Sequence, residues 1–344
     1  MTAAVASRQY DDLTPQTVLD ALDGVGLRGD GRIIQLNSFE NRVFQVFLED
    51  GRVVVAKFYR PGRWTDAQIL EEHSFALELA QAEVPVVPPW VLLPAADATA
   101  VVDVRGDPPT LGCVRGSTHR VSVSTRCAGR EPELEAEATL RQLGRFIGRL
   151  HDVGRRRKFE FRHVIDPQAD GLRARQLLLA GGFVPPEVEA AWDSVTKAAL
   201  EQVQRAFDGV PGLRRQRLHG DCHLGNVLWR DGAPHVVDLD DACVGPAVQD
   251  LWMLVSGDAR SMEHQLALML DGYTQFMDFD RRELSLIEPL RTLRMVRHSA
   301  WLAERWGDPA FPRAFPFFGT AAYWSQQIVQ MREQLELMGP AVLT

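Results

Sequence analysis

The chain carries HGDCHLGN at residues 219–226 and VVDLDD at residues 236–241, and these two stretches determine which fold we expect. Phosphoryl transfer needs an acceptor hydroxyl held in line with a γ-phosphate, together with Mg²⁺ that neutralises the phosphate oxygens. An Asp can face the hydroxyl, a tight loop can bring back an Asn as a metal ligand, and an Asp after the next hairpin strand can supply another. We therefore predict Asp221 and Asp238 as catalytic residues. Asp221 orients the hydroxyl, and Asn226 and Asp238 bind Mg²⁺.

Two other interpretations of these stretches are less well supported. Gly, Asp and Asn also make ordinary turn hydrogen bonds, but the second acidic cluster at hairpin spacing favours a shared site over a simple loop. His219, Cys222 and His223 are residue types that bind zinc. A mononuclear zinc site needs further ligands, however, and the remaining candidates fit no standard spacing. We expect structural roles for both histidines.

A lysine and a glutamate upstream fit the same chemistry. Lys57 ends a β-branched run, VVVAK at residues 53–57, where the alternation of a strand can aim its ammonium group into a cleft toward the α- and β-phosphates. The following helix, expected over residues 67–82, carries Glu72 on its apolar stripe, where an unpaired charge is costly. We predict that Glu72 holds Lys57, and that Glu71, about 100° around the helix, is solvated.

These segments together carry a resemblance to a known family. The stretches that carry it are LHGDCHLGNVLWRDGAPHVVDLDD at 218–241, GPAVQDLWML at 245–254 and VVVAKFYRPGRWT at 53–65. They resemble the bacterial stress response kinase A family, within the aminoglycoside phosphotransferase and choline kinase-like branch of the protein kinase superfamily. The similarity extends over nearly the whole chain.

The resemblance implies roles for two further residues. No GxGxxG motif precedes Lys57, and LNSFENR at residues 36–42 stands where the nucleotide loop should be. In the resembling family this hairpin covers the ATP phosphates, so Ser38 is implied to touch them, and a hydroxyl with free backbone N–H groups can bind phosphate without glycine. Asp250 is implied to brace the catalytic loop by accepting backbone hydrogen bonds.

The order of patterns along the chain predicts a bilobal, protein-kinase-like α+β fold. Residues 1–127 read as a small antiparallel sheet with one helix, and form the nucleotide-binding lobe. Within it we expect a loop over residues 103–116. Residues 128–344 read as a larger helical lobe for catalysis and substrate binding. Adenine is expected to take backbone hydrogen bonds near residues 124–128.

Composition limits the classes of partner. The net charge of −8 argues against a nucleic-acid or anionic-membrane binder. No stretch reaches the ~18 consecutive apolar residues of a membrane span, and the N-terminus lacks a signal peptide's apolar region. The four cysteines form neither a zinc ribbon nor a disulfide framework. We expect a soluble cytoplasmic monomer.

The function favoured by the resemblance is an ATP- and Mg²⁺-dependent Ser/Thr protein kinase that can autophosphorylate. The alternative is a kinase for a small hydroxylated molecule such as an aminoglycoside, choline, homoserine or a sugar. A third hypothesis, an inactive pseudokinase, is disfavoured because every expected position carries a functional residue type. Several residues near the C-terminus could wall the acceptor site or simply form a packing face: Arg294, Arg297, His298, Trp301 and Trp306.

Overall fold

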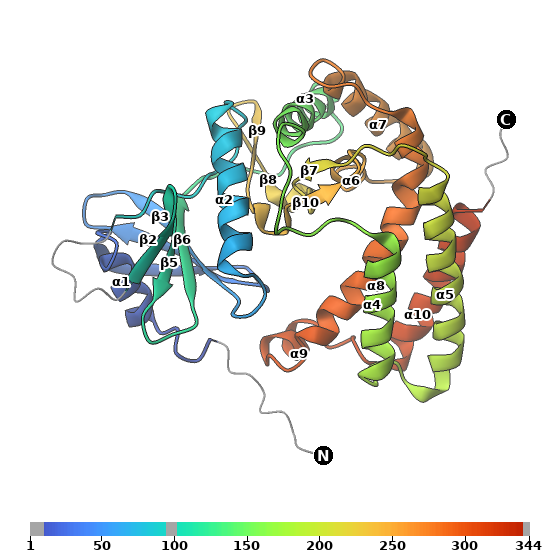
Figure 1. Ribbon diagram of the computed structural model, residues 1–344, viewed down its shortest axis with the longest axis horizontal. Helices are drawn as coiled ribbons and strands as arrows, with labels where there is room; N and C mark the ends of the chain where they lie inside the picture. Colours follow the sequence, from blue (N-terminus) through green and yellow to red (C-terminus); the bar gives the residue numbers. More distant parts are fainter. Residues whose placement is uncertain (1–9, 94–101, 340–344) are drawn as a thin grey trace.

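The computed structural model describes residues 10–93 and 102–339, and it places a sheet at one end of the molecule beside a larger helical part (Figure 1). The predicted α+β class is thereby confirmed. The sheet is antiparallel, with strand order β1-β2-β3-β6-β5-β4. Its strands are β1 Gly29–Leu36, β2 Arg42–Leu48, β3 Val53–Tyr59, β4 Val102–Gly106, β5 Pro109–Val114 and β6 Arg120–Thr125. Lys57 lies on the central strand β3, opposite Val43 of β2 and Ser122 of β6.

Two helices accompany the sheet, where the sequence predicted one. Helix α1 (Pro15–Asp23) begins at Thr14, whose side chain caps the Thr17 N–H, with Pro15 at the first helical position. Its apolar residues complete a core with β2, β3 and β6. Helix α2 (Asp66–Gln81) begins with a capping box formed by Thr65 and Gln68. It lies between the sheet and the helical part, as Figure 1 shows.

The predicted loop over residues 103–116 is wrong, because much of it forms the hairpin β4–β5. The sequence there contains Asp107, Pro108 and three glycines, which suggested an irregular connection. Leu111 and Val114 are nevertheless buried on the sheet, and their burial stabilises the hairpin. The boundary predicted between residues 127 and 128 falls in the segment between β6 and α3 and stays a prediction.

The second part consists mainly of helices, including α4, which the sequence analysis did not predict. Two pairs of short strands interrupt the helices, β7 with β10 and β8 with β9. The elements are α3 Glu137–Gly154, α4 Pro167–Ala180, α5 Pro186–Asp208, β7 Gln216–Leu218, η1 Leu224–Asn226, β8 Val227–Arg230, β9 Ala233–Val236, η2 Leu239–Asp241, β10 Cys243–Gly245, α6 Gln249–Trp252, α7 Ala259–Tyr273, η3 Arg281–Leu286, α8 Ile287–Glu304, α9 Ala310–Ala314 and α10 Ala321–Leu337.

A close helix pair packs against the loop after β7 and the β8–β9 hairpin. Helices α3 and α7 approach so closely that a Cβ atom at Gly144 would lie 1.8 Å from the Met269 carbonyl oxygen, and one at Gly272 would lie 2.0 Å from that of Arg141. Only glycine permits this contact. The same apolar cluster includes Cys222 and residues of β8 and β9, so the loop after β7 rests on packed core. Among the described residues, no helix combines the length and apolarity needed to cross a bilayer.

Candidate active site

Asn226 and Asp238 flank the two strands of one β-hairpin and lie side by side at its base. β8 and β9 pair with Val227 opposite Val236, so the residue before β8 and the second residue after β9 meet at the base of the hairpin. The Val237 N–H donates to the Asn226 carbonyl oxygen over 3.0 Å. The structure therefore brings together two residues that the sequence analysis assigned to one site, and their role as Mg²⁺ ligands stays a prediction.

Asp221 lies in the loop between β7 and β8, close to Asn226. The Asn226 side-chain Nδ2 donates to the Asp221 carbonyl oxygen over 3.0 Å, which fixes the two residues relative to each other. The Asp221 carboxylate contacts Arg294 Nη1 at 2.6 Å and His223 Nε2 at 3.5 Å. Burial alone would raise the pKa of Asp221, but His223 and Arg294 outweigh it and hold the pKa well below its usual range. Asp221 is therefore a carboxylate.

Lys57 points at the segment that follows β9. Its Nζ atom lies 2.9 Å from Asp238 Oδ1 and 3.1 Å from Asp240 Oδ1. Burial favours the neutral amine, yet these two carboxylates raise the pKa of Lys57 well above its usual value. Asp238 has left-handed backbone angles (φ 61°, ψ 66°), and its side chain is half exposed. Lys57 is thus a charged group that faces the proposed metal ligand.

The predicted ion pair between Lys57 and Glu72 is not formed. Glu72 is buried, as predicted from the apolar stripe of α2, and its carboxylate lies 3.7 Å from His73 Nε2. Burial raises the pKa of Glu72 to about 7, and the positive charge of Lys57 only partly opposes this. Lys57 pairs with Asp238 and Asp240 because the turn after β9 places two carboxylates about 3 Å from its ammonium group.

The sequence analysis did not place Asp240 in the site, although its carboxylate is almost fully buried beside Lys57. Besides Lys57, it accepts hydrogen bonds from Arg63 and from the Asn41 side-chain amide at 3.2 Å. Burial would raise its pKa, but Lys57, Arg63 and Arg162 lower it strongly. The sequence signal was the run of three acidic residues after β9, which did not distinguish the buried one from the exposed ones.

Ser38 lies in the loop of the β1–β2 hairpin, next to this cluster. Its Oγ atom accepts a hydrogen bond from the Asn41 N–H over 3.3 Å, and the Asn41 side chain reaches Asp240. The hairpin loop therefore touches the segment that holds Asp238. This placement agrees with a loop over bound phosphates, and the contact of Ser38 with them stays a prediction.

Asp250 braces the loop that carries Asp221, as predicted. This fully buried carboxylate accepts hydrogen bonds from the backbone N–H groups of His219 (2.8 Å) and Gly220 (2.9 Å), and it pairs with His151 Nε2 at 3.1 Å. His219 also contacts the Val237 carbonyl oxygen at 3.0 Å, which links the loop to the second strand of the hairpin. The structural role predicted for His219 is thereby confirmed.

The side-chain oxygen atoms of Asn226 and Asp238 are suitable ligands for a hard divalent cation. Mg²⁺ binds through one or two carboxylates together with waters and substrate phosphates, so it needs no dense protein cage. Asn226 donates through Nδ2 and so keeps its side-chain oxygen as a possible ligand, while the Asp238 carboxylate is half exposed. Within residues 10–93 and 102–339, no cluster of three His, Cys, Asp or Glu side chains forms a ready-made metal site.

The arrangement of a loop carboxylate, a hairpin Asn and Asp, and a strand lysine matches a known family. The model of the phosphotransferase enzyme family matches residues 32–287, about three quarters of the chain. The chain belongs to this family. The match includes every predicted site residue of this phosphotransferase, from Ser38 to Asp238.

Curated relatives of the phosphotransferase cover almost its full length. Stress response kinase A of Salmonella choleraesuis (strain SC-B67) is 41% identical over 329 residues, which are 96% of this chain and 94% of the relative. The serine/threonine protein kinase RdoA of Salmonella typhimurium (strain LT2) is also 41% identical over the same share of each chain. Stress response kinase A of Escherichia coli (strain K12) is 40% identical, again over 96% and 94%. The predicted resemblance is confirmed.

Solved structures with low sequence identity share the fold. Amicoumacin kinase in complex with AMP-PNP and Ca²⁺ superposes with a TM-score of 0.70 at 19% identity, covering 96% of this chain and 95% of that one. The microcompartment-associated aminopropanol kinase gives a TM-score of 0.69 at 17% identity, covering 95% and 99%. The kinase-like fold of the phosphotransferase is therefore shown.

Glu71 was predicted to be solvated, and this is wrong. Its carboxylate accepts hydrogen bonds from three consecutive backbone N–H groups, those of Glu160, Phe161 and Arg162, in the loop between α3 and α4. Arg162 in turn donates from Nε to the Ala242 carbonyl oxygen and from Nη2 to the Asp240 carbonyl oxygen. This contact connects α2 of the phosphotransferase to the turn after β9. No local pattern could have revealed it.

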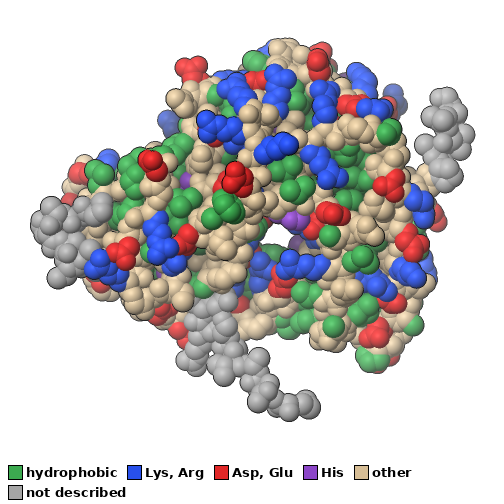
Figure 2. All heavy atoms as spheres, viewed as in Figure 1, with side chains coloured by type: hydrophobic (Ala, Val, Ile, Leu, Met, Phe, Trp, Pro, Cys, Tyr) green, Lys and Arg blue, Asp and Glu red, His purple; other side chains and the backbone are tan. Residues whose placement is uncertain are grey.

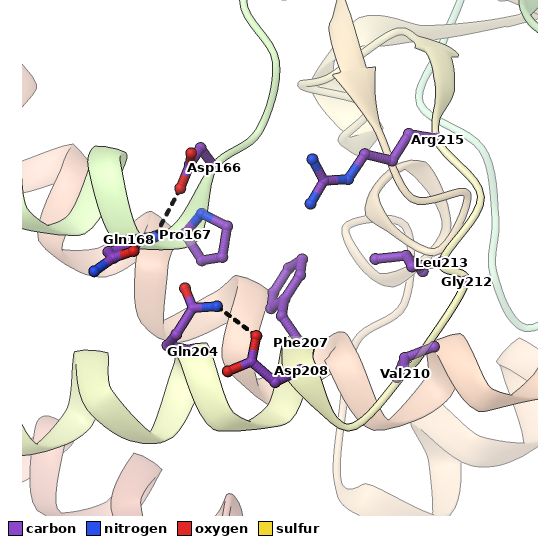
Figure 3. A pocket seen from close by; sticks show the side chains of 10 residues that line it. All are labelled: Asp166, Pro167, Gln168, Gln204, Phe207, Asp208, Val210, Gly212, Leu213 and Arg215. Carbon is purple, nitrogen blue, oxygen red and sulfur yellow. Dashed lines mark hydrogen bonds between the residues drawn. The ribbon is translucent and has the colours of Figure 1, made fainter.

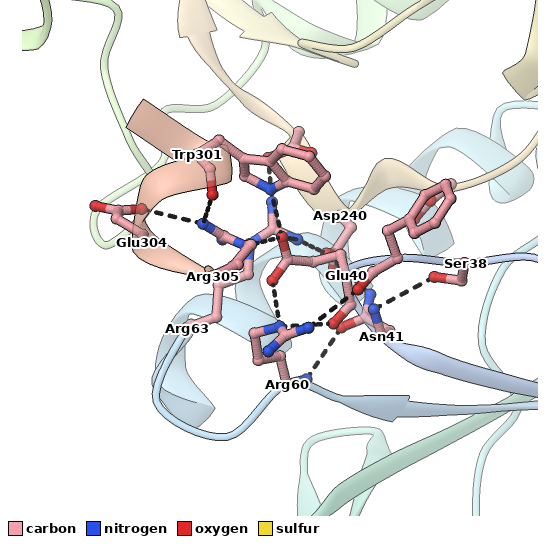
Figure 4. A network of polar contacts seen from close by, with 12 residues as sticks. Ser38, Glu40, Asn41, Arg60, Arg63, Asp240, Trp301, Glu304 and Arg305 are labelled. Carbon is pink, nitrogen blue, oxygen red and sulfur yellow. Dashed lines mark hydrogen bonds and ion pairs between the residues drawn. The ribbon is translucent and has the colours of Figure 1, made fainter. Parts of the chain in front are cut away.

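A second set of polar contacts joins the β1–β2 hairpin to the C-terminal helices (Figure 4). The Glu40 carboxylate lies 3.0 Å from Arg60 Nε, 2.7 Å from Arg305 Nε and 2.6 Å from Trp301 Nε1. Arg60 also contacts Asp308 at 3.0 Å. We call Glu40, Arg60, Trp301, Arg305 and Asp308 the hairpin clamp. The clamp holds the predicted nucleotide loop of the phosphotransferase against α8.

One pocket lies away from all these residues. It has a volume of about 440 Å³ and opens between the start of α4 and the end of α5 (Figure 3). Asp166 and Phe207 lie on its two sides, and Arg215 borders it from the segment before β7. None of the predicted site residues of the phosphotransferase lines it.

Proposed function

We propose that this phosphotransferase is an ATP- and Mg²⁺-dependent serine/threonine protein kinase that can phosphorylate itself. The single observation that carries phosphoryl transfer is the meeting of Asp221, Asn226, Asp238 and Lys57 around the base of the β8–β9 hairpin. The protein acceptor rests on the relatives, one of which is named a serine/threonine protein kinase, at 41% identity over 96% of the chain.

Each residue has a distinct part in the proposed mechanism. Lys57 binds the α- and β-phosphates, because it is a partly buried cation on β3 that faces the metal ligand. Asn226 and Asp238 hold Mg²⁺, which neutralises charge on the phosphate oxygens. Asp221 accepts a hydrogen bond from the acceptor hydroxyl and aligns it with the γ-phosphorus. Because its pKa is low, Asp221 orients the hydroxyl and takes the proton late in the transfer.

The test is a γ-phosphate transfer assay with radiolabelled ATP and Mg²⁺, offered the protein itself, generic Ser/Thr proteins and a panel of small hydroxylated compounds. Asp221→Ala should abolish transfer and leave ATP binding largely intact, because this carboxylate acts on the acceptor. Asp238→Ala should also weaken Mg·ATP binding, seen as a smaller thermal shift with the ligand. Near wild-type turnover in either variant would contradict the assigned roles.

The second candidate is a kinase for a small hydroxylated molecule. The observation that favours it is the fold, since amicoumacin kinase and aminopropanol kinase superpose on nearly the whole chain. Label that appears only in a small molecule would select this candidate and leave the catalytic residues unchanged. Label in phosphoserine or phosphothreonine, absent from the Asp221→Ala variant, would select the protein kinase.

Three further parts of the proposal concern organisation. The nucleotide-binding lobe comprises residues 1–127 and the catalytic lobe residues 128–344. Adenine takes backbone hydrogen bonds from residues 124–128, at the end of β6. The protein works as a cytoplasmic monomer, which sedimentation of the purified chain and cell fractionation would test.

A further inference from the structure

Helix α8 presents a run of positive charge in an acidic protein. Between Glu288 and Glu304 it carries Arg291, Arg294 and Arg297, and no Asp or Glu. The chain as a whole has a net charge of −8, so the charge of this segment is opposite in sign to that of the whole chain. Charges concentrated in one place act on nearby ligands far more than the net charge of the molecule does.

The positive charge on α8 reaches the catalytic carboxylate. Arg294 Nη1 lies 2.6 Å from Asp221 Oδ1, although 44% of the Arg294 side chain remains exposed. The side chain of Arg297, three residues later, is 46% exposed. Among the described residues its one ion pair is with Asp170, at a distance of 4.0 Å. Burial and the neighbouring Arg294 lower the pKa of His298, whose ring stacks on Trp301 at 5.6 Å. Figure 2 shows a hollow in the middle of the face in view, with His, Lys or Arg, and Asp or Glu side chains at its rim.

These contacts decide which acceptors can approach. The hydroxyl that receives phosphate must come within hydrogen-bond reach of Asp221, and its neighbouring groups then lie beside Arg294. Asp221 is already paired with Arg294, so it offers little attraction to an ammonium group. An ammonium group placed beside Arg294 meets a charge of the same sign, which repels it. A carboxylate, in contrast, can bind the fork of an arginine through two hydrogen bonds.

We propose that Arg294 selects the acceptor, so that the enzyme phosphorylates a Ser or Thr within an acidic peptide segment and rejects cationic acceptors. This inference rests on the proposed protein kinase function, and it names the substrate class of the same site. It also separates this enzyme from kinases whose hydroxyl acceptors carry an amino group, because Arg294 contacts the carboxylate that faces the acceptor hydroxyl.

The test uses the full-length protein with Mg·ATP and three serine peptides of equal length, whose flanking residues are acidic, neutral or basic. For the wild type we expect kcat/KM to be at least tenfold higher for the acidic than for the basic peptide. Arg294→Glu should reverse this order, and Arg294→Gln should remove the preference. The control is Arg332→Glu, the same charge change at an exposed arginine of α10, which should keep the wild-type order.

The outcomes separate the two claims. Equal kcat/KM for all three peptides would overturn the selection by Arg294 and leave the protein kinase function standing. No transfer to any peptide, with label in small molecules only, would overturn both. If Arg294 only holds Asp221 in place, its variants will lower kcat for all peptides by the same factor and keep their order, which also refutes the proposal. Arg294→Lys should retain the preference for the acidic peptide.

Discussion

Replacing Glu71 by alanine tests the contact between α2 and the loop after α3. The carboxylate accepts three backbone hydrogen bonds, and a hydrogen bond to a charged group contributes about 1.5–3 kcal/mol. Two of the three N–H groups are exposed and will bind water instead, whereas the Arg162 N–H is partly buried. We therefore expect Glu71→Ala to lower the free energy of unfolding by about 2 kcal/mol. Urea denaturation followed by tryptophan fluorescence measures this change.

The same substitution should reach the active site through Arg162. Arg162 holds the carbonyl oxygens of Asp240 and Ala242, so a looser loop should raise the KM for Mg·ATP more than it changes kcat. The control is Glu133→Ala, which removes a carboxylate with one exposed arginine partner and should cost no more than about 1 kcal/mol. If Glu71→Ala is as stable as Glu133→Ala, and its KM matches the wild type, the contact contributes nothing and the argument fails.

Three other substitutions have clear expected outcomes. Burial raises the pKa of Glu72 from an ordinary 4.5 to about 7, so its contribution to stability, about 3 kcal/mol, is full below pH 4.5 and is lost as the pH rises through 7. Glu72→Gln should reduce this pH dependence, which is measured as the difference in the free energy of unfolding between pH 5 and pH 8. The same difference in the variant as in the wild type would contradict the argument. Asp250→Asn keeps only one of the two oxygens that accept hydrogen bonds from the catalytic loop. We expect kcat to fall at least tenfold, which corresponds to the loss of roughly one hydrogen bond to a charged group, while the circular dichroism spectrum stays unchanged. Glu40→Ala leaves Arg60 and Arg305 without this carboxylate and should destabilise the fold by about 3 kcal/mol in thermal unfolding, while no change would show that the hairpin clamp is not stabilising.

The catalytic loop and the hairpin could be predicted because their functional residues are close together in the sequence. Asp221 and Asn226 are five residues apart, and Asp238 follows β9, so a tight loop and one hairpin bring them together. Lys57 follows from the alternation of a single strand. In each case the distance along the chain is short enough for local geometry to determine the distance in space.

Contacts between distant segments could not be predicted in this way. Both Glu71 and Glu72 are carboxylates on α2, and helical periodicity correctly placed only Glu72 in the interior. The partner of Glu71 is a row of backbone N–H groups about 90 residues away, and backbone groups leave no mark in the sequence. Lys57 was assigned to Glu72 because that carboxylate lies on the apolar stripe of α2. The closeness of Asp240 to Lys57 depends on how the turn after β9 packs against β3, which no local pattern shows.

The hairpin clamp also sets a condition on how the protein is made. Glu40 is translated early, whereas its partners Trp301 and Arg305 lie 261 and 265 residues further along the chain. A ribosome-bound nascent chain can pair Glu40 with Arg60, but it cannot make the contacts of Glu40 with α8 until α8 has left the ribosome. The clamp therefore forms only in the nearly complete polypeptide, and a chain shortened before residue 301 would keep its sheet and lose the contacts of the hairpin with α8.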